Sequence, residues 1–116
     1  MTNNFKRKNS FEKRYQESEG INKKFPDRVP IIVQKYLDAE LPDIDKCKYL
    51  VPRDMTMSKF MFIIRKRINI DSTQSLFIMI NNSMVVGSKS ISDIYDDMKD
   101  EDGFLYMTYT SENTFG

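Results

Sequence analysis

The chain has 116 residues, 30% of them charged, and a net charge of only +1. A chain of this length forms one domain and buries roughly two-thirds of its unfolded surface, so its core needs no metal or disulfide. With one cysteine, Cys47, and no histidine, the sequence excludes a disulfide framework, a cysteine cluster for zinc and histidine-based catalysis. No signal sequence and no apolar run near the ~18 residues of a membrane span are present, which indicates a reducing, cytoplasmic location.

The charges are unevenly distributed along the chain. Residues 1–67 contain 16 Lys and Arg against 9 Asp and Glu, whereas residues 68–116 contain 2 against 8. The two parts therefore carry +7 (16 − 9) and −6 (2 − 8). Such an imbalance is typical either of two solvated faces of one domain or of a basic footprint for an acidic partner.

A helix is predicted over residues 11–24. Ser10 is a suitable N-cap, Pro26 prevents continuation, and apolar side chains recur at loosely helical spacing. These apolar residues, which should form the packing face of an amphipathic helix, are Phe11, Tyr15, Ile21 and Phe25. The polar residues before Phe5 and the segment 5–8 predict a mobile or short helical start.

Two strands should follow, over residues 29–36 and 48–52. Both segments are rich in β-branched or aromatic residues, and Pro42 and Asp43 lie in the connection. Pro52 lacks a backbone N–H, so it should end the second strand or place it at a sheet edge.

Thr56 is a suitable N-cap for a second long helix that ends before residues 69–71. Its apolar residues form two adjacent ridges: one of Met57, Met61, Ile64 and Ile68, and one of Phe60, Ile63 and the stem of Arg67. Together the ridges span roughly 160°, more than the ~100° that packing on one sheet requires. The second ridge is therefore expected to line a groove, unless a deeper core covers both.

Segments 76–80 and 104–109 are apolar on both faces, which is typical of central strands covered on each side. Between them, Ser90 begins a short helix that ends near the solvated carboxylates of residues 100–102. The order of elements predicts an α+β fold, a ubiquitin-like β-grasp with a four-stranded mixed sheet. Residues 1–26 should form a helical extension packed on the other sheet face, and residues 27–116 the ubiquitin-like domain with a C-terminal tail.

The sequence ends at Gly116, whose carboxylate has no Cβ beside it. Such a carboxyl can enter a narrow enzyme channel and be activated for amide formation. A terminal glycine is also common by chance, since glycine is about 7% of an average protein.

Several segments together resemble the autophagy ubiquitin-like modifiers, the family of GABA-receptor-associated protein. The matching segments are Phe11–Arg14, Phe25–Pro30, Asp45–Lys46, Lys48–Pro52, Phe62–Arg67 and Glu112–Gly116. The resemblance implies that Gly116 is conjugated to the amine of phosphatidylethanolamine by activating and conjugating enzymes. It also implies that a cysteine protease exposes the glycine or removes the lipid. The conjugated form would sit on autophagosomes or another organelle membrane, and no cofactor is implied.

The resemblance also implies a site for cargo-receptor peptides with an acidic-aromatic-x-x-aliphatic motif, beside the strand 48–52. The pocket for the aromatic residue would be formed by Glu17, Ile21, Pro30, Lys48, Leu50 and Phe104. The pocket for the aliphatic residue would be formed by Tyr49, Val51, Pro52, Met55, Phe60 and Ile63. The acidic flank would meet Arg28, Lys46 and Arg67. An edge strand suits this task because its free amide and carbonyl groups accept an extended peptide.

Two other classes of protein fit parts of the sequence less well than this adaptor. Carboxylate pairs such as Asp96–Asp97 leave an enzyme conceivable, but the serines and Cys47 have no histidine to act as their base. A module that binds tubulin or RNA could use the basic segments 6–8 and 65–67, although neither lies within an aromatic stacking pattern. The family uses the region of Phe77 and Met79 as a second docking surface, but a buried central strand also explains both residues.

Overall fold

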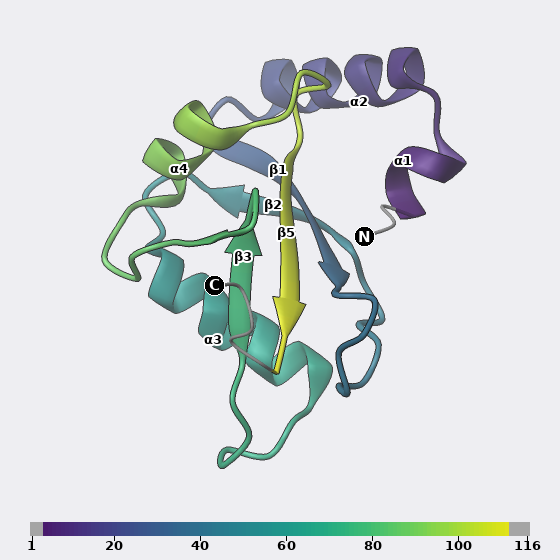
Figure 1. Cartoon of the computed structure of the whole chain (residues 1–116). Helices are drawn as coiled ribbons and strands as arrows, with labels where there is room; N and C mark the ends of the chain where they lie inside the picture. Colours follow the sequence, from purple (N-terminus) through teal and green to yellow (C-terminus); the bar gives the residue numbers. More distant parts are fainter. Residues whose placement is uncertain (1–3, 112–116) are drawn as a thin grey trace.

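The computed structural model describes residues 4–111. Its elements in chain order (Figure 1) are α1 (Asn4–Lys8), α2 (Phe11–Lys24), β1 (Arg28–Lys35), β2 (Lys48–Pro52), α3 (Met57–Ile68), β3 (Phe77–Ile80), β4 (Ser83–Met84), α4 (Ile91–Met98) and β5 (Leu105–Thr110). None of the described helices combines the length and hydropathy that a bilayer-spanning helix requires.

The strands form one mixed sheet in the order β2-β1-β5-β3-β4. β1 and β5 are parallel, and the other neighbours are antiparallel. The predicted α+β, ubiquitin-like arrangement is confirmed, with a fifth strand in addition to the four expected. This two-residue strand β4 follows a tight turn in which Asn81 and Asn82 have φ of 50° and 62°. Asparagine tolerates this left-handed conformation, which two-residue hairpin turns require.

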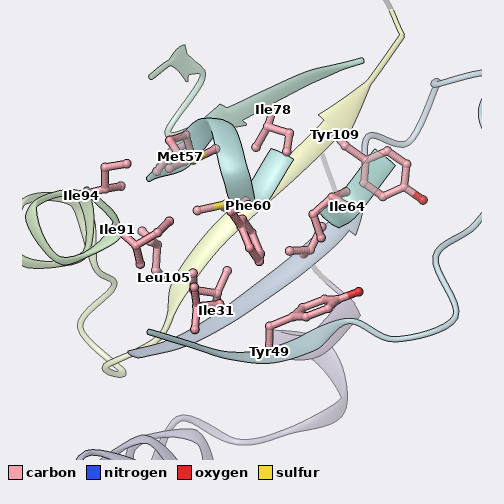
Figure 2. Close-up of a cluster of buried hydrophobic side chains, with 14 of the residues drawn as sticks. Ile31, Tyr49, Met57, Phe60, Ile64, Ile78, Ile91, Ile94, Leu105 and Tyr109 are labelled. Carbon is pink, nitrogen blue, oxygen red and sulfur yellow. The ribbon is translucent and has the colours of Figure 1, made fainter. Parts of the chain in front are cut away.

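The main core lies between α3 and one face of the sheet (Figure 2). Met57, Phe60 and Ile64 of α3 are buried against Ile31 of β1 and Leu105 of β5. A smaller cluster of Phe5, Ile32 and Phe104 lies on the other sheet face, because Ile31 and Ile32 alternate along β1. α1 therefore covers the second face through Phe5, whose ring meets that of Phe104 edge-on at 5.1 Å.

The three longer helices begin at the predicted caps. The hydroxyls of Ser10, Thr56 and Ser90 each accept a hydrogen bond from the backbone N–H three residues later. Each bond satisfies one backbone N–H of the first helical turn that has no partner within the helix. Because this interaction is local, the helix starts could be predicted from the sequence.

The packing face predicted for α2 is wrong in part. Phe11 and Tyr15 are 49% and 43% exposed, whereas the buried residues of this helix are Arg14 and Ser18. The Arg14 guanidinium lies 2.5 Å from a carboxylate oxygen of Asp102, and the Ser18 hydroxyl donates to the Asp102 carbonyl at 2.5 Å. α2 is thus held by polar contacts that helical periodicity does not reveal.

Asp102 also departs from the solvated position expected of it. Its side chain is fully buried, and its carboxylate accepts bonds from the Phe104 N–H at 2.9 Å and the Tyr106 hydroxyl at 2.5 Å. Burial, reinforced by this bond to Asp102, raises the pKa of Tyr106 above its usual value. The carboxylate is stable inside because the donors and the Arg14 charge replace water.

Candidate functional site

β2 forms one margin of the sheet. Within residues 4–111 it pairs only with β1, from Arg28 opposite Pro52 to Ile32 opposite Lys48. Its burial alternates: Tyr49 and Val51 are buried toward α3, while Lys48 and Leu50 point to the other face and are half-buried. The open edge of β2 therefore lies between the buried side chains that face α3 and the half-buried side chains that face the opposite side of the sheet.

On the side of α2, the structure brings together the residues predicted for the aromatic pocket. Leu50 lies opposite Pro30 in the β1–β2 register, and the Lys48 ammonium forms an ion pair with Glu17 of α2. Glu17, Ile21, Lys48 and Leu50 are partly exposed, whereas Pro30 and Phe104 are buried and lie beneath them.

Phe5 belongs to this region and was missed by the sequence analysis. It covers Phe104, and the Lys48 ammonium lies 5.6 Å from the centre of its ring. Phe5 is the one large apolar residue between Asn3 and Ser10, and this isolation was the available signal.

On the side of α3, Tyr49 and Phe60 meet edge-on with ring centres 5.8 Å apart. Val51 and Phe60 are buried in the main core, so Phe60 of the second ridge is covered by this core instead of lining an open groove. Pro52, Met55 and Ile63 are partly exposed, and Met55 packs against the main core, whereas Pro52 alternates with Val51 and shares the face of Lys48 and Leu50. Burial raises the pKa of Tyr49 to about 12, and its hydroxyl has no hydrogen-bond partner among the described residues.

The three predicted cationic contacts are exposed but do not all cluster. Lys46 lies 5.0 Å above the Tyr49 ring, and Arg67 Nε lies 2.9 Å from an Asp45 carboxylate oxygen. Arg28 is at the other end of β2, opposite Pro52. Exposed ion pairs such as Arg67–Asp45 contribute at most about 1 kcal/mol, so an incoming carboxylate can compete for the cation.

The remaining residues singled out from the sequence are less informative. Gly116 lies outside the described residues. Cys47 is exposed, Phe77 is half-buried, and Met79 is buried and lines a cavity of about 500 Å³ with Tyr36 and Tyr106. Within residues 4–111, no group of three or more acidic, cysteine or histidine side chains is placed to hold a metal ion.

The fold and the sequence match one family. The crystal structure of Trypanosoma brucei ATG8 covers 100% of both chains with a TM-score of 0.91 at 38% identity. The model of the family described as "Autophagy protein Atg8 ubiquitin like" matches residues 13–116. The chain belongs to the Atg8 family of ubiquitin-like autophagy proteins.

Curated Atg8 proteins extend this match over the full length. The chain is 50% identical over 112 residues to autophagy-related protein 8e of Arabidopsis thaliana, covering 97% of this chain and 92% of the relative. It is 47% identical over 116 residues to autophagy-related protein 8 of Mycosarcoma maydis, covering 100% and 98%. The resemblance seen in the sequence is therefore confirmed, and the family bears the name of a ubiquitin-like protein rather than of an enzyme.

Proposed function

We propose that this Atg8 protein is conjugated through the Gly116 carboxyl to phosphatidylethanolamine and then acts as an adaptor on the autophagosome or another organelle membrane. There it binds cargo-receptor peptides with an acidic-aromatic-x-x-aliphatic motif along β2. Its other partners are the ubiquitin-like activating and conjugating enzymes and the processing cysteine protease. Family membership and a fold without a described membrane-spanning helix support this proposal.

The observation that carries the proposal is the open edge of β2. A peptide added to this edge gains backbone hydrogen bonds, and its alternate side chains point to opposite faces of the sheet. The aromatic residue then lies over Leu50 and Lys48, and the aliphatic residue on the α3 side over Met55 and Ile63, where partly exposed apolar surface is present. Acidic residues before the aromatic one approach Lys46, which stands just before β2 and is exposed.

Micromolar affinity is expected for such a peptide. Each pocket residue contributes about 1.5 to 3 kcal/mol, and ordering of the peptide offsets part of this gain. A dissociation constant near 1 μM corresponds to about 8 kcal/mol.

The first prediction concerns Leu50. Replacement by alanine removes apolar contact with the aromatic residue and should weaken peptide binding about tenfold, since that loss is worth about 1.4 kcal/mol. NMR titration of the wild-type protein should shift amide signals from Lys48 to Pro52. The control is Leu37→Ala, because Leu37 is 67% exposed and lies outside β2. Unchanged affinity in Leu50→Ala, or shifts confined to other elements, would count against β2 as the docking edge.

The second prediction concerns Gly116. Two acyl chains at about 0.8 kcal/mol per buried methylene hold a protein on a bilayer, whereas one chain binds only marginally. Incubation with conjugation enzymes of a close relative, ATP and phosphatidylethanolamine vesicles should give an adduct that floats with the vesicles and has the added mass of the lipid. Gly116→Ala should abolish this adduct. An alanine variant that is conjugated at the wild-type rate refutes the role of the terminal glycine.

A further inference from the structure

The outward side of α3 combines positive charge with exposed apolar surface. The twelve residues of α3 include four cations and no carboxylate. Arg67 points toward Asp45, and the other three cations, Lys59, Arg65 and Lys66, surround Phe62. Lys59 and Lys66 are exposed, whereas Arg65 is half-buried and its guanidinium donates to the Asp71 and Gln74 carbonyls at 3.3 and 2.8 Å. Phe62 is 57% exposed, and the Lys66 ammonium lies 4.6 Å from the centre of its ring. We call the group Lys59, Phe62, Arg65 and Lys66 the α3 outer face.

Neighbouring residues extend the apolar part of this surface. Ser58 donates its backbone N–H to the Gly87 carbonyl at 2.9 Å, which places the loop containing Val86 beside the start of α3. Val86 is 69% exposed. A hollow of about 250 Å³ adjoins Phe62 and is lined by Met61, Arg65 and Leu76. Phe62 belongs neither to the main core nor to the β2 edge, so neither of them explains why an aromatic side chain is exposed here.

The α3 outer face lies within reach of the proposed lipid anchor. α3 and α2 cover opposite faces of the sheet (Figure 1), and Tyr109 near the end of β5 packs in the same core as Ile64 of α3 (Figure 2). Five residues follow Ser111 up to Gly116, and they span at most about 18 Å. The outer side of a helix packed on a sheet stands about 15 Å from the strands. A bilayer that holds Gly116 can therefore also touch α3.

We propose that the α3 outer face is a contact surface for anionic phospholipid, which orients the conjugated protein on its membrane. The lysine and arginine side chains meet lipid phosphates and carboxylates, and Phe62 enters the interfacial layer, where aromatic rings are favoured. This contact rests on the conjugation of Gly116 proposed above, because the anchor supplies the high local concentration of lipid.

The positive charge of the α3 outer face and its closeness to the proposed lipid anchor both favour an anionic lipid surface as its binding partner. Each Lys or Arg near an anionic membrane favours contact about fivefold, so the two exposed lysines, Lys59 and Lys66, favour it about 25-fold. Contact between exposed charges is screened by salt. With α3 toward the membrane, α2 points away from it on the opposite side of the sheet.

Tryptophan reporters test this orientation, since the chain contains no tryptophan. The reporter is Phe62→Trp, and its matched control is Phe11→Trp on α2, where Phe11 is 49% exposed. In both, Cys47→Ser and Gly116→Cys allow coupling of the full chain to a maleimide-headgroup lipid without any enzyme. The vesicles are phosphatidylcholine with or without phosphatidylserine, and each carries a quencher at a shallow acyl position.

Fluorescence quenching of the Phe62→Trp protein should rise about twofold or more when phosphatidylserine is added, and should return to the lower value in high salt. The Phe11→Trp protein should be quenched little in either lipid. Lys59→Gln with Lys66→Gln should remove most of the increase, whereas Lys13→Gln with Lys23→Gln on α2 should leave it intact.

Two results overturn the proposal: equal quenching of the two reporters, or quenching of the Phe62→Trp protein that does not depend on phosphatidylserine. The second result is the one expected if the α3 outer face serves an acidic protein instead. Since the anchor is attached chemically, this measurement is independent of whether the enzymes accept Gly116. Failure of enzymatic conjugation and failure of the lipid contact are therefore distinguishable.

Discussion

Asp102 joins the N-terminal helices to the sheet. Its buried carboxylate meets Arg14 at 2.5 Å, and its main chain accepts the Ser18 hydroxyl. The partly buried ion pair between Lys6 of α1 and Asp100, at 2.6 Å, adds a second connection to the same loop. Burial opposes ionisation of Asp100, yet the bonds from Lys6 and from the Asp102 N–H prevail and lower its pKa.

Asp102→Asn should destabilise the protein by about 3 kcal/mol, because it keeps the side-chain shape but leaves the Arg14 charge almost buried without its counterion. Denaturant unfolding at neutral pH measures this loss. The control is Lys89→Gln, which removes an exposed ion pair of 3.9 Å with Asp97 and should cost less than about 0.5 kcal/mol. Equal losses of unfolding free energy in the two variants would show that the buried pair contributes no more to stability than an exposed ion pair.

The proposed peptide site illustrates what a sequence reveals about the positions of single residues. Among the residues that the family resemblance grouped, Leu50 lies opposite Pro30 and Glu17 pairs with Lys48; their role in peptide binding stays a prediction. It could not show that Phe104 and Phe60 are fully buried, because Phe5 covers Phe104 and the main core encloses Phe60.

α2 is positioned by a close approach between helix and loop. Gly103 has φ of +89°, and a Cβ there would lie 2.2 Å from the Ser18 hydroxyl oxygen. Only glycine combines this left-handed conformation with the short distance. The helix can therefore dock through Ser18 only while residue 103 lacks a side chain.

Gly103→Ala should displace Ser18, loosen α2 and lower the global stability by about 2 kcal/mol through strain and the lost bond. Hydrogen exchange should quicken in α2 more than in β1 and β5. Gly20→Ala is a matched control: nothing lies within 4 Å of its Cβ position, and alanine is favoured in a helix by about 1 kcal/mol. If amide protection in Gly103→Ala fell as much in β1 and β5 as in α2, the contact between Gly103 and Ser18 would not be what holds α2 in place.

Helix starts were predictable from the sequence because a cap is a local interaction over three residues. Two features were not predictable. The docking of α2 depends on Arg14 and Asp102, which are 88 residues apart. β4 depends on the left-handed conformations of Asn81 and Asn82, which the sequence permits but does not require.

We propose the division of the chain that the sequence predicts: a helical extension of residues 1–26 and a ubiquitin-like body of residues 27–116. The main core lies between Val29 and Tyr109, entirely within the body. The extension contributes Phe5 to the smaller cluster and Arg14 to the buried ion pair.

A chain that begins at residue 27 should keep the sheet and α3 by circular dichroism but unfold at a lower denaturant concentration. It loses the cover over Phe104 and the counterion of Asp102, so we expect it to bind a hydrophobic dye that the full chain does not bind. Stability equal to that of the full chain, with no dye binding, would show that residues 1–26 are an appendage rather than part of the structure.

β5 is the last strand along the described chain, yet it lies in the middle of the sheet, between β1 and β3. On the ribosome, these two strands emerge first and have no shared partner until residues 105–110 leave the exit tunnel. A polypeptide that terminates before Leu105 leaves β1 and β3 each with an unpaired edge, which can pair with strands of other chains. We therefore expect an interrupted translation product to aggregate and only a nearly complete polypeptide to fold.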